Sequence, residues 1–125
     1  MPDTREIAEA LVGHCRAHTE AEGLATLYAK DAESIEANAM PDGSRVSRGI
    51  EAIEGKHEWW AQNFDVHSSE VDGPYIHDNR FAVMFTMDVT EKASGSRWKM
   101  SEIGLYTVED GKIAREEFFQ APMPG

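Results

Sequence analysis

Apolar residues near the N-terminus recur with the period of an α-helix. They do so from Ile7 to Cys15, and Asp3, which precedes them, is typical of a residue that caps a helix. Thr19 provides a second capping signal ahead of another short apolar stripe. The pattern therefore predicts two short helices, over residues 4–18 and 20–29, that fold against each other.

The next segment combines turn signals with a third helical stripe. A short strand is predicted at Glu33–Asn38, and the Pro and Gly within Met40–Ser44 indicate a turn. A third helix is predicted from just after Ser47 to about Phe64, because the stripe repeats at spacings of three and four. That stripe consists of Ile50, Ile53, His57, Trp60 and Phe64.

After the third helix the period of the pattern changes to two, which is the period of a strand. Four strands are predicted, over Val66–His77, Arg80–Glu91, Arg97–Val108 and Lys112–Gln120. Gly73-Pro74 interrupts the first of them, whereas the second places five apolar side chains on one face. Asp110-Gly111 is a hairpin signal between the last two.

This order of elements is an α+β pattern, with helices early in the chain and a run of long antiparallel strands after them. No repeat, low-complexity stretch or linker divides the sequence, so residues 1–125 are expected to form a single domain. A long curved sheet that wraps a helical layer leaves a cone-shaped cavity between the two. Polar residues at inward-facing positions are therefore the candidates for function.

The charge balance excludes some partners. The 125 residues include 12 Lys and Arg against 23 Asp and Glu, so the formal net charge is −11 and nucleic acid or an anionic membrane would be repelled. Cys15 is the only cysteine, which excludes an internal disulfide. The chain shows neither a signal-peptide start nor a run of about 18 apolar residues, so we expect a cytoplasmic protein with no membrane partner.

Motifs for cofactor or metal chemistry are missing from the sequence. It has no Gly-rich dinucleotide fingerprint, phosphate-binding loop or nucleophile elbow, so no cofactor is expected. His14 and His18 lie four residues apart on a predicted helix, but no third ligand accompanies them. No metal site is expected.

Glu102 interrupts an otherwise apolar strand face. It shares that face with Met100 and Tyr106, where an ionised carboxylate is costly to desolvate unless it is paired. A raised pKa at such a position suits a general acid, or a neutral carboxyl that donates a hydrogen bond. One alternative is an ion pair with Arg97, Lys99 or Arg115 at the edge of the sheet, and another is a twist of the strand that takes Glu102 to solvent.

Two further candidates lie on other predicted elements. Glu36 stands near the end of the first predicted strand, where a carboxylate at the mouth of a pocket can shuttle protons. The alternative is that Glu36 is one of many surface acids. His57 lies in the apolar stripe of the third helix, and its ordinary pKa near neutrality suits a base, a hydrogen-bond donor or a polar lining residue. The alternative for His57 is a core histidine bonded to a backbone carbonyl.

Glu116 and Glu117 are neighbours in the last predicted strand, so they point to opposite faces of the sheet. Parity assigns the inward position to Glu116, whereas a β-bulge would assign it to Glu117. Inward apolar side chains would form walls for an apolar or aromatic ligand, or would simply be core. The predicted ligand-binding residues are Tyr28, Trp60, Phe85, Met87, Met100, Phe118 and Gln120.

Several runs resemble those of the nuclear transport factor 2-like superfamily. Leu27–Ala32 resembles the run after its second helix, Ser47–Ile53 the start of its third helix, and Tyr106–Ile113 its last hairpin. The ending Arg115–Phe119 is similar to that of SnoaL-like proteins, and the resemblance extends over about residues 4–121. It implies a cone of three N-terminal helices packed on a strongly curved, mostly antiparallel sheet, and a homodimer formed through that sheet.

The resemblance also implies roles for individual residues. Glu36 falls where the ketosteroid isomerase branch keeps its general base, and Tyr28 and His57 fall where it can have tyrosines of its hydrogen-bond network. Val12 and Gly104 stand where that branch has its oxyanion-hole tyrosine and its protonated aspartate. The oxyanion donors are therefore missing at their usual places.

In SnoaL-type cyclases the acid/base is an Asp on the last strand. Glu116 or Glu117 is the candidate for that role here, with a side chain that is one methylene longer. Gln120 sits where an acid often closes the run.

Two hypotheses of function follow. The first is a cofactor-independent isomerase or cyclase, in which Glu36 or Glu116 removes a proton next to the carbonyl of a hydrophobic substrate. Glu102, with His57 or Tyr28, would then hydrogen-bond the enolate oxygen. The second is a non-catalytic module of the same fold that binds a ligand or dimerises. A buried Glu102 that faces an open cavity favours the enzyme, whereas a Glu102 paired at the surface favours the module.

Overall fold

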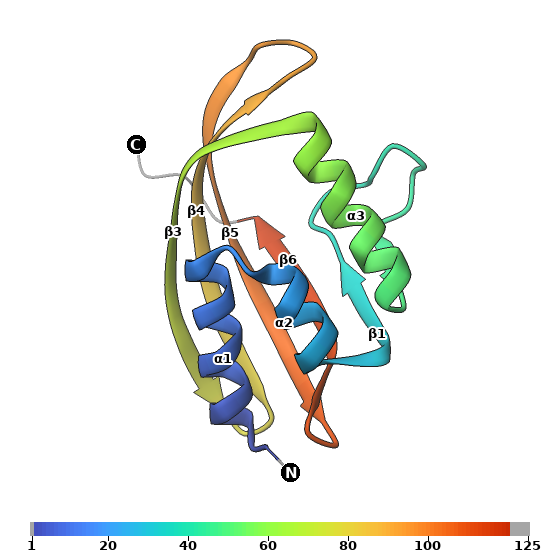
Figure 1. Cartoon of the computed structure of the whole chain (residues 1–125), viewed down its shortest axis with the longest axis vertical. Coiled ribbons are helices and arrows are strands. Elements are labelled where there is room, and N and C mark those ends of the chain that lie inside the picture. The colour runs from blue at the N-terminus through green and yellow to red at the C-terminus, as the bar shows by residue number, and fades with distance from the viewer. Residues whose placement is uncertain (1, 121–125) are drawn as a thin grey trace.

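The structure, a computed structural model, describes residues 2–120 and is drawn in Figure 1. Along the described chain the elements are α1 (Thr4–Ala17), α2 (Glu20–Leu27), β1 (Tyr28–Ile35), β2 (Val46–Arg48), α3 (Ile50–Asn63), β3 (Phe64–His77), β4 (Arg80–Glu91), β5 (Arg97–Glu109) and β6 (Lys112–Gln120). The predicted α+β class is confirmed.

The strands form one sheet in the order β2-β1-β6-β5-β4-β3. β1 and β6 run parallel, and every other neighbouring pair is antiparallel, so the prediction of a mostly antiparallel sheet is confirmed. The parallel pair places β1, from the first third of the chain, against the last described strand. In this register Ser34 lies opposite Glu116.

The helices cover one face of the curved sheet (Figure 1). α1 packs on β3 and β4, α2 packs on α1, and α3 lies over β1 and β2. No helix between residues 2 and 120 is long and apolar enough to cross a membrane. Burial of apolar side chains between the helices and the sheet is the main stabilising term. The buried core includes Ile7, Leu11, Leu24, Ile53, Phe81, Val83, Val108 and Ile113.

Two local signals act as the sequence predicts. A side-chain oxygen of Asp3 accepts a hydrogen bond from the backbone N–H of Glu6 at 2.8 Å, which caps α1. Asp110 and Gly111 have φ angles of 51° and 76°, the two positive values that a tight type I′ hairpin turn requires. Both the start of α1 and the β5–β6 hairpin are therefore confirmed.

The second helix is shorter than predicted. α2 ends at Leu27, and Tyr28, which the pattern assigns to the helix, opens β1 by pairing with Ile113 of β6. Thr19 is the N-cap residue, but its hydroxyl hydrogen-bonds the ring of His14 at 2.7 Å and the carbonyl of His14 at 3.4 Å, and it makes no capping bond to the backbone of α2. Pairing with a strand distant in sequence overrides the local helical period at Tyr28.

The segment between α2 and α3 differs from the prediction at its edges. β1 ends at Ile35, so Glu36 lies just beyond the strand, although its N–H still donates to the carbonyl of Arg45 at 2.8 Å. The predicted turn is confirmed by the N–H of Gly43, which donates to the carbonyl of Met40 at 2.8 Å. The sequence pattern does not predict β2, because three residues are too few for a period to register.

The interruption predicted at Gly73-Pro74 is present as a break in the strand pairing, but it does not end the strand. β3 begins at Phe64 and continues through the proline to His77. Its pairing with β4 shifts register between Asp72 and Tyr75. The sheet thus accommodates a residue without an N–H through a local irregularity on an edge strand.

Candidate functional site

A cavity of about 1120 Å³ opens between the helices and the inner face of the sheet. Its volume is slightly above the usual range for small-molecule sites, about 300–1,000 Å³. Gln120, the last residue of β6, is exposed and is not among the residues that line it. The other predicted ligand-binding residues all line the cavity: Tyr28, Trp60, Phe85, Met87, Met100 and Phe118.

Glu116 is the buried acid of the last strand. It is 2% exposed and lines the floor of the cavity, so the inward position belongs to Glu116. Glu117 faces outward, where it pairs with Arg115 at 3.5 Å. The hydroxyl of Tyr28 donates to one carboxylate oxygen of Glu116, and Ser34 Oγ donates to the other at 2.9 Å. Two hydroxyl donors thus replace the water that this carboxylate loses on burial.

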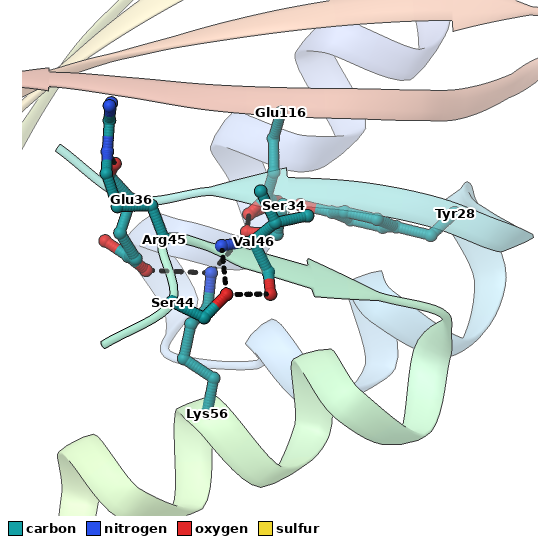
Figure 2. Close-up of polar contacts among 8 residues, drawn as sticks. All are labelled: Tyr28, Ser34, Glu36, Ser44, Arg45, Val46, Lys56 and Glu116. Carbon is teal, nitrogen blue, oxygen red and sulfur yellow. Dashed lines mark hydrogen bonds and ion pairs between the residues drawn. The ribbon is translucent and has the colours of Figure 1, made fainter. Parts of the chain in front are cut away.

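Lys56 extends this network toward the cavity mouth. Figure 2 shows its side chain reaching from α3 toward Ser34 and Glu36. Its ammonium donates to Ser34 Oγ and pairs with Glu36 Oε1 at 2.8 Å. The Lys56 side chain is only 9% exposed, against 27% for Glu36, and its Nζ lies 5.4 Å from the centre of the Phe118 ring. A continuous chain of polar contacts therefore runs from buried Tyr28 to half-exposed Glu36.

Glu102 stands apart from this network. It is half-buried on β5, lines the cavity, and has no hydrogen bond or ion pair to any other residue described in the structure. Of the basic residues that the alternative hypothesis paired with it, Arg97 instead pairs with Asp88 at 2.9 Å and Arg115 with Glu117. The third, Lys99, is exposed and lies outside the cavity lining. Burial and the nearby charge of Glu36 raise the pKa of Glu102 to about 7, although Lys56 acts in the opposite direction. The carboxyl is therefore poised to take or give a proton near neutral pH.

His57 lies at the cavity wall beside this carboxyl cluster. Desolvation by the surrounding residues lowers its pKa, against the opposing effect of the Glu116 charge. The imidazole is therefore neutral at pH 7, and the reading of His57 as a buried core residue is wrong because it is exposed to the open cavity.

Two other protonated groups line the cavity. Burial and the neighbouring Glu116 raise the pKa of the Tyr28 hydroxyl well above its usual value, so it remains a donor. Burial likewise raises the pKa of the Cys15 thiol to about 12, so Cys15 is a poor nucleophile. Within residues 2–120, no group of three or more His, Cys, Asp or Glu side chains is arranged to hold a metal ion.

Sequence reasoning did not single out Lys56 or Ser34. Lys56 follows Ile53 by three residues and precedes Trp60 by four, so it fits the apolar stripe of α3 as well as His57 does. Ser34 lies two residues before Glu36, and the alternation of β1 places both on the side that faces Lys56. These spacings are compatible with inward-facing positions, but a Lys or Ser on the surface could have the same spacing.

Comparison with known proteins connects this site to a family. The SnoaL-like domain family matches residues 3–120. A solved structure from Mesorhizobium loti is similar, at 40% identity and a TM-score of 0.88 over 94% of this chain and 99% of that one. It is named as a candidate SnoaL-like polyketide cyclase, with the added term carbohydrate phosphatase. Among curated proteins, none matches the sequence.

More distant structures share the fold. A nuclear transport factor 2-like protein from Burkholderia thailandensis is 17% identical, with a TM-score of 0.83 over 97% of this chain and 92% of that one. A candidate isomerase from Bacillus subtilis is 16% identical, with a TM-score of 0.72 over 97% and 91%. The fold expected from the sequence resemblance is therefore confirmed.

Proposed function

The chain belongs to the SnoaL-like domain family, and from that premise we propose that it binds a neutral, largely apolar carbonyl compound in the cavity. There Glu102 moves a proton at the carbon next to the carbonyl. The names of two similar structures, a candidate polyketide cyclase and a candidate isomerase, denote chemistry of this kind.

The observation that carries the proposal is the state of Glu102. It faces an open cavity of about 1120 Å³, no described residue pairs with it, and its pKa is raised to about 7. General acid–base catalysis works best when the pKa of the group is close to the working pH, since one residue can then both accept and return the proton. A carboxyl fully engaged in an ion pair would be a weaker base.

The charges around the cavity favour a neutral ligand. Lys56 is the one Lys or Arg among the lining residues that the structure describes, and Glu36 already pairs with it. A carboxylate or phosphate ligand would meet repulsion from the lining acids. These acids are Glu20, Glu22, Glu36, Glu102 and Glu116.

The proposed step conserves atoms and electrons. The Glu102 carboxylate takes a proton from the carbon next to the carbonyl, the C–H electron pair forms a carbon–carbon double bond, and the carbonyl π pair moves to oxygen. The neutral Glu102 then returns the proton to another carbon of the conjugated enolate. In a ring closure, a nucleophilic carbon of the enolate instead attacks a second carbonyl carbon, whose π pair moves to its oxygen, and the resulting alkoxide takes the proton from Glu102. Neither route changes the oxidation state of the substrate overall, so the proposal requires no cofactor.

The other polar residues act around this step. Glu116 accepts hydrogen bonds from the hydroxyls of Tyr28 and Ser34, so it holds the cavity floor in place and is a positioning residue in this proposal. His57 is neutral and lines the cavity, so its ring N–H can donate a hydrogen bond to a polar group of the ligand.

The test has a binding stage and an exchange stage. A thermal-shift screen of hydrophobic ketones and phenols identifies compounds that raise the melting temperature by binding the native state. Ketones that bind are then incubated with the protein in D₂O, and NMR follows deuterium uptake at the carbon next to the carbonyl. Glu102→Gln is expected to slow that uptake by about 10²-fold or more.

Glu117→Gln is the matched control. It makes the same chemical change on the outer side of the same sheet, where Glu117 pairs with Arg115 at 3.5 Å. This variant should exchange deuterium at the wild-type rate. Uptake that survives in Glu102→Gln would contradict the assignment of Glu102. Binding without catalysed uptake by any variant would favour the non-catalytic module.

We also propose that a second copy of this chain covers the outer face of the sheet. Ile103 and Phe119 are paired across β5 and β6 there and are 36% and 48% exposed. A chain with a net charge of −11 repels its own copies in general, but this face carries both signs of charge in its Arg97–Asp88 and Arg115–Glu117 pairs. Apolar contact can therefore operate there without net repulsion.

Sedimentation equilibrium tests this dimer. The wild-type protein should behave as a dimer at micromolar concentration, and Ile103→Arg should shift it to a monomer with an unchanged circular dichroism spectrum. A monomeric wild-type protein at all concentrations would overturn the dimer proposal and leave the cavity proposal unaffected.

A further inference from the structure

Lys56 lines the cavity but has no role in the proton transfer proposed above. It projects from α3, its side chain is 9% exposed, and it is the one Lys or Arg among the lining residues described. An ammonium group that is desolvated to this degree costs free energy unless its surroundings compensate it.

Its surroundings hold the ammonium in one place. Glu36 Oε1 lies 2.8 Å from the nitrogen on one side, and Ser34 Oγ accepts a hydrogen bond on another. Ser34 is itself anchored, because it donates to Glu116 at 2.9 Å (Figure 2). The Phe118 ring, whose centre lies 5.4 Å away, approaches from the sheet. An ammonium has three N–H bonds, and two of them meet these oxygens.

When Glu102 takes a proton from the substrate, the substrate becomes negatively charged, and a nearby ammonium group can stabilise that charge. The negative charge moves to the substrate oxygen, inside a cavity whose lining is mostly acidic where it is charged. Donors fixed in advance toward a developing oxyanion are the largest single contribution in many such reactions. Without a cation near that oxygen, the carboxylates around the cavity would raise the barrier.

The positions where the ketosteroid isomerase branch has its oxyanion donors are not filled by donors here. Val12 is 2% exposed and packs in the core, and Gly104 has no side chain. A Cβ at residue 104 would lie only 2.9 Å from the ring of Tyr106, so any larger residue there would clash. The Tyr28 hydroxyl is committed to Glu116.

We infer that Lys56 is a second catalytic residue, whose third N–H donates to the carbonyl oxygen of the substrate and stabilises the enolate oxyanion. The substrate then lies with its acidic C–H toward Glu102 and its oxygen toward Lys56. This inference rests on the proposed function and defines the ligand further, as a ketone that binds in its neutral form and is held as an enolate by an ammonium group.

The experiment measures the ionisation of bound phenols, which resemble enolates. 2-Naphthol and 4-nitrophenol change their absorption spectra on ionisation, so the pKa of each can be titrated in its complex with the protein. Lys56→Met is expected to raise the pKa of the bound phenol by at least one unit compared with wild type. That difference is tenfold in the ionisation equilibrium.

Matched variants separate charge from structure. Lys99→Met makes the same change at an exposed position outside the cavity lining and should leave the pKa of the bound phenol unchanged. Lys56→Arg keeps the positive charge, so it should raise the pKa of the bound phenol less than Lys56→Met does. Lys56→Gln retains an N–H donor for Ser34 and Glu36, so it serves as the neutral variant should Lys56→Met not fold.

The outcomes distinguish the two proposals. Phenols that bind Lys56→Met or Lys56→Gln with the wild-type ionisation would overturn the role of Lys56, while deuterium exchange would still support Glu102. A wild-type protein that binds neither phenols nor ketones would overturn both, since the inference rests on the cavity as a ligand site. The result expected is a pKa of the bound phenol that is raised more in the neutral variants than in Lys56→Arg and is unchanged in Lys99→Met.

Discussion

The inner face of β4 and β5 has two halves that look alike in sequence and behave differently in the structure. In one half, Phe81 and Tyr106 stack at 4.8 Å between ring centres and are almost fully buried, with Tyr106 forming the inner end of the cavity wall. In the other half, Phe85 and Glu102 continue the same alternation but line an open cavity. The alternation selects the face of the sheet, and the helix above decides whether that face is sealed.

The polar groups follow the same division. Within residues 2–120, no buried side-chain nitrogen or oxygen lacks a hydrogen-bond partner. Glu116, Ser34 and Lys56 satisfy one another at the boundary between the two halves. Glu102, in the open half, has no such partner among the described residues and lines the open cavity instead. The open half is thus less stable locally and chemically more available.

The largest test of this contrast compares two phenylalanines of β4. Phe81→Ala should lower the free energy of unfolding by about 3–5 kcal/mol, because it leaves a cavity in a sealed core. Phe85→Ala should cost much less, about 1 kcal/mol, because its side chain already faces an open space. Urea denaturation measures both. Equal losses would mean that the cavity half is closed in solution, and the contrast would not hold.

The second test concerns pH. Glu102 has a pKa of about 7 in the folded protein against an ordinary value of 4.5, so the folded state holds its proton where the unfolded state has released it. Stability therefore falls as pH rises from about 4.5 to 7, by about 3 kcal/mol from this group, and the loss is complete above pH 7.

Removing the carboxylate isolates this effect. Glu102→Gln should lose that part of the pH dependence, so its stability relative to wild type should increase from pH 4.5 to pH 8. Denaturation curves at several pH values measure the difference, and Glu117→Gln is the control. A constant difference between Glu102→Gln and wild type across this range would show that Glu102 ionises in the folded protein as it does in water.

The smallest expected effect lies at the boundary between the halves. Tyr28→Phe removes a buried donor to Glu116 and should cost about 1–2 kcal/mol of stability, because one carboxylate oxygen loses its partner. Tyr75→Phe is the matched control, because that hydroxyl bonds Asp72 on the exposed outer side and its removal should have no measurable effect. Similar losses of stability in the two variants would contradict the conclusion that the hydrogen bond from Tyr28 to Glu116 stabilises the fold.

Much of this arrangement could be predicted from the sequence. β4 and β6 have the predicted bounds, and the Asp110-Gly111 turn joins β5 to β6 as expected. Glu102 stood out because a carboxylate in an apolar alternation is costly, and that argument requires no knowledge of its neighbours. For Glu116, alternation with Phe118 was sufficient, because the register shift in the β5–β6 pairing falls between Ile113 and Arg115, before Glu116 is reached.

The rest depends on neighbours that are distant in sequence. Lys56 is a site residue only because α3 places it beside Ser34 and Glu36, which are more than 19 residues earlier in the chain. Tyr28 leaves the helical period because β6, which starts at Lys112, pairs with it. The pattern of apolar residues along one helix or strand shows which of its faces is buried. It does not show which other helix or strand packs against that face.

The sequence by itself determined the class of fold, the inward faces of the long strands and the acid that does not belong in an apolar face. These properties follow from local periodicity and from the cost of desolvating a charge. Only the tertiary structure decided which acids are paired, which half of the cone stays open, and that a lysine of α3 meets the carboxylates of the sheet. Electrostatic pairing depends on distances of a few ångströms between elements, and packing of the whole chain is what sets those distances.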